Sequence, residues 1–115
     1  MVIKRAQGSF VKSTIASGQT ISAGNFVGLS NGEAVLSDNS TNTETIGVAK
    51  YVEGSTIIIQ TSGKFSNSTS GSEYWLSTSG SITNIIPTSG IVQKVATRLD
   101  SQNILIDIDK TVIIL

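Results

Sequence analysis

Apolar residues recur along the chain in short runs, some alternating with polar residues and some continuous, and turn-forming residues separate the runs. The runs return about every 8–12 residues, which is a spacing typical of all-β domains. No apolar stripe of helical periodicity persists for more than two turns. The pattern therefore predicts ten strands, near 9–15, 25–29, 33–37, 45–51, 56–61, 73–77, 81–85, 91–97, 103–108 and 111–114.

Two dipeptides predict tight hairpins between these strands. Asn31-Gly32 is the stronger signal, because a type I′ turn needs positive φ at both central residues, and Ser79-Gly80 is a weaker one. Ile57-Ile58-Ile59 is apolar on both faces of its strand. This predicts either a central strand or a strand that a partner covers.

The chain contains an internal repeat, which appears when the sequence is aligned with itself after a shift of 47 residues. The first matched pair is Gly24 with Gly71. Chance matching is the alternative in a sequence of low diversity, but one offset shared by separate elements favours duplication of a β-unit. The other matched segments are Leu29-Ser30 with Leu76-Ser77, Val35 with Ile82, Val48-Ala49 with Val95-Ala96, and Ile57-Ile58-Ile59 with Ile104-Leu105-Ile106.

We therefore predict an all-β fold, a single small β-barrel or sandwich built from two related β-units, with a β-clip as one form of it. The units cover about 24–61 and 71–108. Neither unit can close a core by itself, so both belong to one domain, 9–115, which an N-terminal arm, 1–8, precedes. A length of 115 residues suits one compact domain.

Composition narrows the chemistry that this domain can perform. The chain has no cysteine and no histidine, so it offers no disulfide, thiolate, imidazole base or Cys/His metal site. Its 8 basic and 8 acidic residues cancel, so no net charge draws it to nucleic acid or to an anionic membrane. No run of residues is long and apolar enough to span a bilayer. We expect a protein that is not an enzyme and has no cofactor, nucleic-acid partner or membrane partner.

Two groups of acidic residues are the remaining candidates for chemistry. Asp107 and Asp109 share one strand face, as the carboxylates of a glycan-active enzyme or a metal pair do, but exposed aspartates at a strand end are the commoner case. Asp38, Ser40 and Asn42 have the spacing of a calcium loop, yet Thr43 stands where such a loop needs glycine. We expect no metal site and no catalytic residues, and the glycan-active enzyme stays as a remote alternative.

The apolar C-terminal segment is the main candidate for subunit contacts. Such a segment frays in water unless it completes its own barrel, pairs in a sheet or is buried between subunits. Adjacent Tyr74 and Trp75 point to opposite faces of one strand, so we expect one in the core and the other at the surface, and either type of side chain makes a strong interface anchor. We predict a homo-oligomer with an interface drawn from Tyr74, Trp75, Val112, Ile113, Ile114 and Leu115.

A series of short segments in the first half has the order and spacing of a known family. The segments are Thr20-Ile21-Ser22-Ala23-Gly24-Asn25-Phe26-Val27-Gly28-Leu29, Asn31-Gly32, Ile46-Gly47-Val48-Ala49, Gly54 with Ile57-Ile58-Ile59, and Ser62-Gly63-Lys64-Phe65. With this series, the first half resembles the capsid decoration proteins of tailed phages.

The second half carries a series of its own, from Gly71 to Ile108. It comprises Glu73-Tyr74-Trp75-Leu76-Ser77, Ile82-Thr83, Pro87-Thr88-Ser89-Gly90, Val92-Gln93-Lys94-Val95-Ala96 and Ile104-Leu105-Ile106-Asp107-Ile108. This half resembles a module of phage tail-fibre, head-fibre and other virion proteins. Ala96-Thr97 departs mildly from the family pattern, which often has Gly-Thr or Gly-Val there.

The resemblance implies a non-enzymatic virion structural protein with no active site to carry over. We expect a capsid decoration or auxiliary head protein that binds the phage major capsid protein and stabilises the outer capsid surface. It would be made in the host cytoplasm and act as a homotrimer, since relatives are commonly trimeric. The alternative is a tail-fibre or head-fibre module that binds a host receptor or glycan.

The N-terminal arm is the candidate for docking to the capsid. Val2 and Ile3 offer an apolar anchor, and Lys4 and Arg5 offer two positive charges for an acidic groove.

Overall fold

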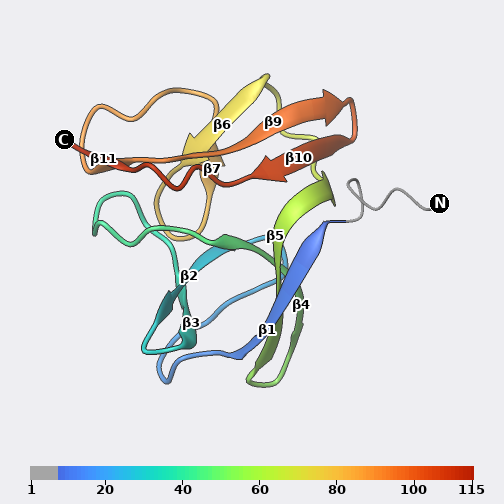
Figure 1. Ribbon diagram of the computed structural model, residues 1–115, viewed down its shortest axis with the longest axis vertical. Coiled ribbons are helices and arrows are strands. Elements are labelled where there is room, and N and C mark those ends of the chain that lie inside the picture. The colour runs from blue at the N-terminus through green and yellow to red at the C-terminus, as the bar shows by residue number, and fades with distance from the viewer. Residues whose placement is uncertain (1–7) are drawn as a thin grey trace.

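Short strands joined by tight turns make up residues 8–115, the part of the chain that the computed structural model describes (Figure 1). None of these residues is helical, and so no described segment is a helix long and apolar enough to cross a membrane. The strands are β1 (Ser9–Thr14), β2 (Phe26–Ser30), β3 (Glu33–Leu36), β4 (Gly47–Glu53), β5 (Thr56–Ser66), β6 (Glu73–Leu76), β7 (Ile82–Thr83), β8 (Ile91–Val92), β9 (Lys94–Asp100), β10 (Asn103–Asp107) and β11 (Ile113–Ile114).

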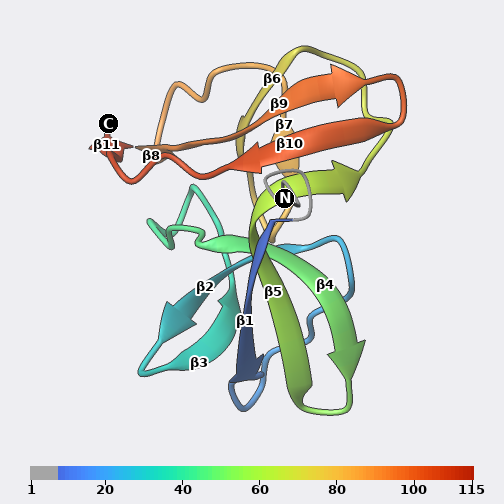
Figure 2. The same cartoon turned by 45° about the vertical axis from the view of Figure 1, so that its right-hand side comes forward.

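Nine of the strands form one antiparallel sheet with the order β3-β2-β4-β5-β10-β9-β6-β7, and β1 pairs with β5 outside this path. The sheet curls into a half-barrel, so that the end of β1 reaches β3 through a bridge between Ile15 and Ala34 (Figure 2). The two remaining strands, β8 and β11, form a separate antiparallel ribbon. The predicted all-β barrel-type fold is confirmed.

All ten predicted strands are present, and the differences lie at their ends. β5 continues to Ser66, because its second half pairs with β10 after its first half has paired with β4 and β1. The strand predicted over 91–97 is broken at Gln93 into β8 and β9, because the Gln93 side chain turns inward and β8 leaves the sheet to pair with β11. The strand predicted over 81–85 is shorter and comprises only β7.

Both predicted hairpin turns have the backbone conformation that their sequences require. Asn31 and Gly32 have φ values of 52° and 78°, and Ser79 and Gly80 have values of 51° and 76°. Glycine is needed at position 80 for a second reason, since a Cβ there would lie 2.9 Å from the Leu36 side chain and 3.1 Å from the Phe26 carbonyl oxygen.

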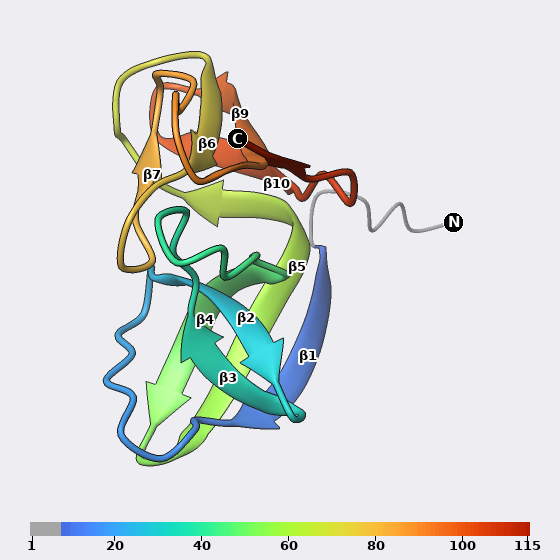
Figure 3. The same ribbon diagram turned by 90° about the vertical axis from the view of Figure 1, so that its left-hand side faces the viewer.

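The two halves of the chain have the same strand order under the 47-residue shift. β4 and β9 match at both of their ends, and β5 and β10 begin at matching residues. In the sheet, β3-β2-β4-β5 is mirrored by β7-β6-β9-β10 (Figure 3). The second hairpin differs by one residue: Gly28 pairs with Val35, but Trp75 pairs with Thr83, because the turn falls one position later. The fold is therefore built from two related β-units, as predicted.

Equivalent residues of the two units fill two hydrophobic clusters. The first-unit cluster comprises Ile21, Val27, Ala34, Ala49, Ile57 and Ile59. Four of these have counterparts in the second-unit cluster, namely Tyr74, Ala96, Ile104 and Ile106.

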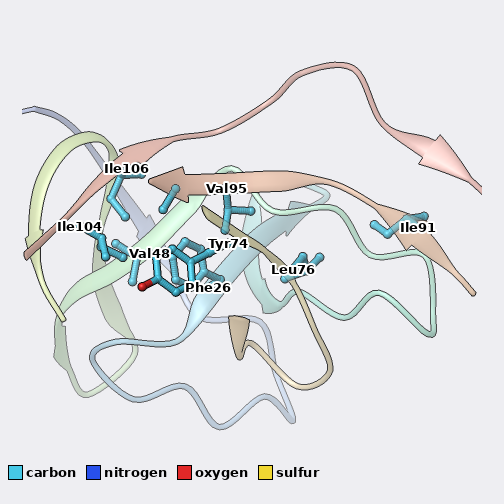
Figure 4. Close-up of a cluster of buried hydrophobic side chains, with 9 residues drawn as sticks. Phe26, Val48, Tyr74, Leu76, Ile91, Val95, Ile104 and Ile106 are labelled. Atoms are coloured by element: carbon cyan, nitrogen blue, oxygen red, sulfur yellow. The ribbon is translucent and has the colours of Figure 1, made fainter. Parts of the chain in front are cut away.

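The second-unit cluster is completed by side chains of the first unit. Phe26 and Val48 lie on the opposite faces of their strands from Val27 and Ala49, and they pack among the second unit's residues (Figure 4). Buried polar groups join the units at the same place: the Thr45 N–H donates to Gln93 Oε1 over 2.9 Å, and Gln93 Nε2 donates to the Thr45 carbonyl over 3.0 Å. The two units thus share the second-unit cluster as a common core and form a single domain.

A shared core predicts that equivalent mutations in the two units affect one unfolding transition. Ile57→Ala and Ile104→Ala each create a cavity among fully buried side chains, and each should lower the free energy of unfolding by about 2–5 kcal/mol. Denaturant unfolding should be followed by far-ultraviolet circular dichroism and by fluorescence of Trp75, the sole tryptophan. Both probes should report the same midpoint in every variant, and the exposed Ile85→Ala should leave it nearly unchanged. Separate transitions, each shifted by only one variant, would contradict the shared core.

Candidate interaction surfaces

The C-terminal segment forms the outer strand of the β8–β11 ribbon. Ile113 pairs with Val92 and Ile114 with Ile91, and the Leu115 N–H donates to the Gly90 carbonyl over 2.8 Å. The segment therefore neither frays nor completes the main sheet. It lies on the second unit, at the end of the molecule away from the β2–β3 and β4–β5 turns (Figure 1).

The predicted interface residues at this end differ in how far their side chains are exposed. Val112 is half-buried and packs against the second-unit cluster. Ile113, Ile114 and Leu115 are 57%, 68% and 62% exposed. Since Ile113 and Ile114 are neighbours in one strand, the strand presents aliphatic side chains on both faces. Among the described residues, β11 pairs only with β8, so its outer edge is unpaired. A strand with two apolar faces and an open edge is a surface suited to subunit contacts.

Tyr74 does not belong to this surface, and its assignment to the interface was wrong. Its side chain is fully buried in the second-unit cluster, so it has no area to offer a second subunit. The hydrogen of its hydroxyl lies between two acceptors, the carbonyl oxygens of Thr69 at 2.7 Å and Gly71 at 2.9 Å from the hydroxyl oxygen, both in the segment between β5 and β6. Trp75, on the opposite face of β6, is half-buried and keeps a surface that a partner can contact.

Arg98 contacts the same segment between β5 and β6. Its guanidinium lies 5.3 Å from the centroid of the Tyr74 ring and donates to the Tyr74 hydroxyl and to the carbonyls of Asn67, Thr69 and Gly71. One arginine thus satisfies several backbone acceptors that the turns of this segment leave free. The sequence carries no motif that marks this arrangement, because the partners are backbone atoms.

The predicted docking residues Val2, Ile3, Lys4 and Arg5 lie outside the described residues. Their role stays a prediction.

Asp38 ties the two units together instead of lining a calcium loop. Its carboxylate accepts from the Ser40 hydroxyl and N–H, and its second oxygen accepts from the Ser79 N–H of the other unit over 3.0 Å. The Ser40 hydroxyl bond, with the backbone bonds from Ser79 and Ser40, outweighs partial burial and holds the pKa of Asp38 below its ordinary value. Within residues 8–115, no group of three or more acidic side chains is arranged to hold a metal ion.

Asp107 and Asp109 are both exposed, and their surroundings differ. Asp107 pairs with Ser62 across the sheet. Asp109 lies beyond the strand, where its carboxylate accepts from the Thr111 N–H over 2.9 Å. Asp109 also lines a cleft of about 500 Å³ between the two units, together with Glu44, Thr61 and Lys110. Asp107 is not among the residues that line this cleft, so the two carboxylates do not face a common cavity.

Two exposed apolar features were not singled out from the sequence. Ile85 and Ile86, in the loop before β8, are 73% and 56% exposed. Phe10 and Tyr51, on β1 and β4, are 50% and 64% exposed. Apolar residues stand side by side in both strands, as Phe10-Val11 in β1 and Tyr51-Val52 in β4, so the pattern alone does not reveal which side faces water.

Comparison of the chain with models of protein families, with curated proteins and with solved structures found no match.

Protonation of Asp38 should weaken the contact between the units. Because its folded pKa is lowered, the carboxylate contributes stability above its unfolded pKa, near 3.8, and this contribution is lost as pH falls through the folded pKa. Asp38→Asn should lower the free energy of unfolding at pH 7 by about 1 kcal/mol, after allowance for solvent screening. It should also reduce the loss of stability between about pH 5 and pH 2. Asp107→Asn, at an exposed carboxylate, is the matched control. If both variants changed the free energy of unfolding and its pH dependence equally, the role of Asp38 in joining the two units would be contradicted.

Proposed function

We propose that this protein is a non-enzymatic structural protein of a tailed-phage virion, a decoration or auxiliary head protein that binds the outer capsid surface and stabilises it. The resemblance of both halves to virion proteins supports the proposal. So does a composition without histidine or cysteine, which leaves few groups for catalysis.

The observation that carries the proposal is the exposed aliphatic strand β11. Three aliphatic side chains in a row are more than half exposed, and their backbone pairs on one side only. Burial of each side chain between subunits contributes up to about 1.5–3 kcal/mol before the cost of ordering. That gain is large beside the total stability of a domain of this size, about 5–15 kcal/mol.

The subunit number of three comes from the resemblance. Three copies arranged around one axis bring three β11 segments together, so that each covers the others' aliphatic side chains. The half-buried Trp75 is a second contact in this proposal. The docking arm, with Val2, Ile3, Lys4 and Arg5, would then connect the assembled oligomer to the capsid.

A fibre module that binds a host receptor or glycan is the second candidate. The resemblance of Gly71–Ile108 to fibre modules favours it, together with the exposed loop that carries Ile85 and Ile86. A fibre occurs in few copies at one position of the virion, whereas a decoration protein covers the capsid lattice. Copy number per virion therefore separates the two candidates.

A charge placed on β11 should dissociate the oligomer. Ile114→Lys puts an ammonium group where the proposal buries an aliphatic side chain, and light scattering of the purified protein should show a shift from oligomer to monomer. Leu29→Lys is the matched control, since Leu29 is 43% exposed on the first unit and its variant should keep the oligomer. A wild-type protein that stays monomeric at high micromolar concentration would refute the oligomer.

Binding to capsids tests the function itself. Labelled protein mixed with expanded, empty capsids should bind at high copy number. Deletion of residues 1–8 should abolish this binding and leave the oligomer intact. Binding to host cells in place of capsids would favour the fibre module, and binding to neither would contradict both candidates.

A further inference from the structure

The outer face of the sheet over β1, β5 and β4 brings together residues that are far apart in the sequence. Ile57 and Ile59 point into the first-unit cluster, so Ile58 between them points outward. Lys12 pairs with Ile58 from one side and Tyr51 pairs with it from the other, and directly paired residues share a face. These three strands lie side by side in the lower part of Figure 2.

Phe10 and Lys50 extend the row. Phe10 lies two residues before Lys12 in β1 and pairs with Gln60, two residues after Ile58, so it belongs to the same face. The Lys50 ammonium lies 5.8 Å from the Tyr51 ring centroid and 5.6 Å from that of Phe65. We call Phe10, Lys12, Lys50, Tyr51 and Ile58 the β1–β5–β4 face.

This face carries positive charge without ion-pair partners. The one ion pair among the described residues is Lys94–Glu73, so no described carboxylate pairs with Lys12 or Lys50. Glu53, which pairs with Thr56, is the acidic residue at the lower rim of the face. Exposed aromatic rings beside unpaired lysines suit a partner that offers carboxylates together with apolar contacts.

The edge of β1 suggests the shape of that partner. β1 pairs with β5 along one side, and at its far end Ser13 Oγ donates to the Gly32 carbonyl in the turn between β2 and β3. Within the described chain, no backbone group pairs with residues Phe10 to Lys12 on the outer side. An extended segment can add to such an edge as a further strand, with alternate side chains on the face.

We infer that the β1–β5–β4 face binds an extended acidic segment of a partner protein, added along the free edge of β1, with a carboxylate at Lys12. Lys50, on β4, lies two strands further from the edge and adds to the positive potential of the face. A nucleic acid fits less well, because the chain has no net charge and Glu53 stands on the same face. The site is separate from β11, and it does not depend on the oligomer or on capsid binding.

The test is a titration of the ¹⁵N-labelled full chain with a capped twelve-residue peptide of alternating glutamate and threonine, followed by NMR. Shifts should concentrate on the amides of β1, β4 and the first half of β5, and binding should weaken as salt rises. Lys12→Glu with Lys50→Glu should weaken binding about tenfold or more. Lys64→Glu with Lys110→Glu makes the same charge change elsewhere and should alter it less than about twofold.

Four results would overturn the inference: no binding, equal binding of a peptide with glutamine in place of glutamate, tighter binding of a twelve-nucleotide oligothymidine, or equal weakening by both double variants. The amide spectrum of each variant shows whether it is folded. Because no virion component is present, failure of this titration leaves the proposed capsid function standing, and failure of capsid binding leaves this site standing.

Discussion

The constraint on which the fold depends is that the second β-unit does not enclose its own core. Its fully buried residues, Tyr74 and Ile104 among them, need Phe26 and Val48 of the first unit to complete their packing. Val48 and its neighbour Ala49 point to opposite sides of β4, so one strand supplies side chains to both clusters. The hydrogen bonds between Thr45 and Gln93 then satisfy the polar groups that this shared packing buries.

This arrangement also decides which surfaces remain open. Because β5 pairs first with β4 and β1 and then with β10, it joins the two units into one sheet and leaves β1 at an edge. Because β8 leaves the sheet at Gln93, β11 pairs with β8 alone and keeps its aliphatic residues in water. Both open edges are consequences of how the two units fit together: β1 pairs with a strand of the first unit, and β11 pairs with a strand of the second. The two proposed contacts, one between subunits and one with a partner protein, therefore fall on separate surfaces.

The strand class, the turns and the repeat were predictable because they depend on local pattern. Alternation and the Asn31-Gly32 turn act over a few residues, and the repeat is visible as matching residues at one offset. The burial of Tyr74 was not predictable, since either face of β6 could have been the inner one until β9 paired with it. The β1–β5–β4 face was missed for the same reason: register between distant strands places Lys12 and Tyr51 on either side of Ile58, and no short-range signal encodes it.

Native-state hydrogen exchange of the full chain tests the shared core most directly. If the two units unfold cooperatively, their core amides should exchange only through global unfolding. The backbone amides of Ile57, Ile59, Ile104 and Ile106 should then show one common free energy of exchange, equal to the free energy of unfolding measured with denaturant. Amides of β11 should exchange with a much smaller free energy in the monomer, because that strand lies outside the shared core. Exchange of one unit's core amides at a clearly lower free energy than the other's would show that the units open separately and would contradict the account.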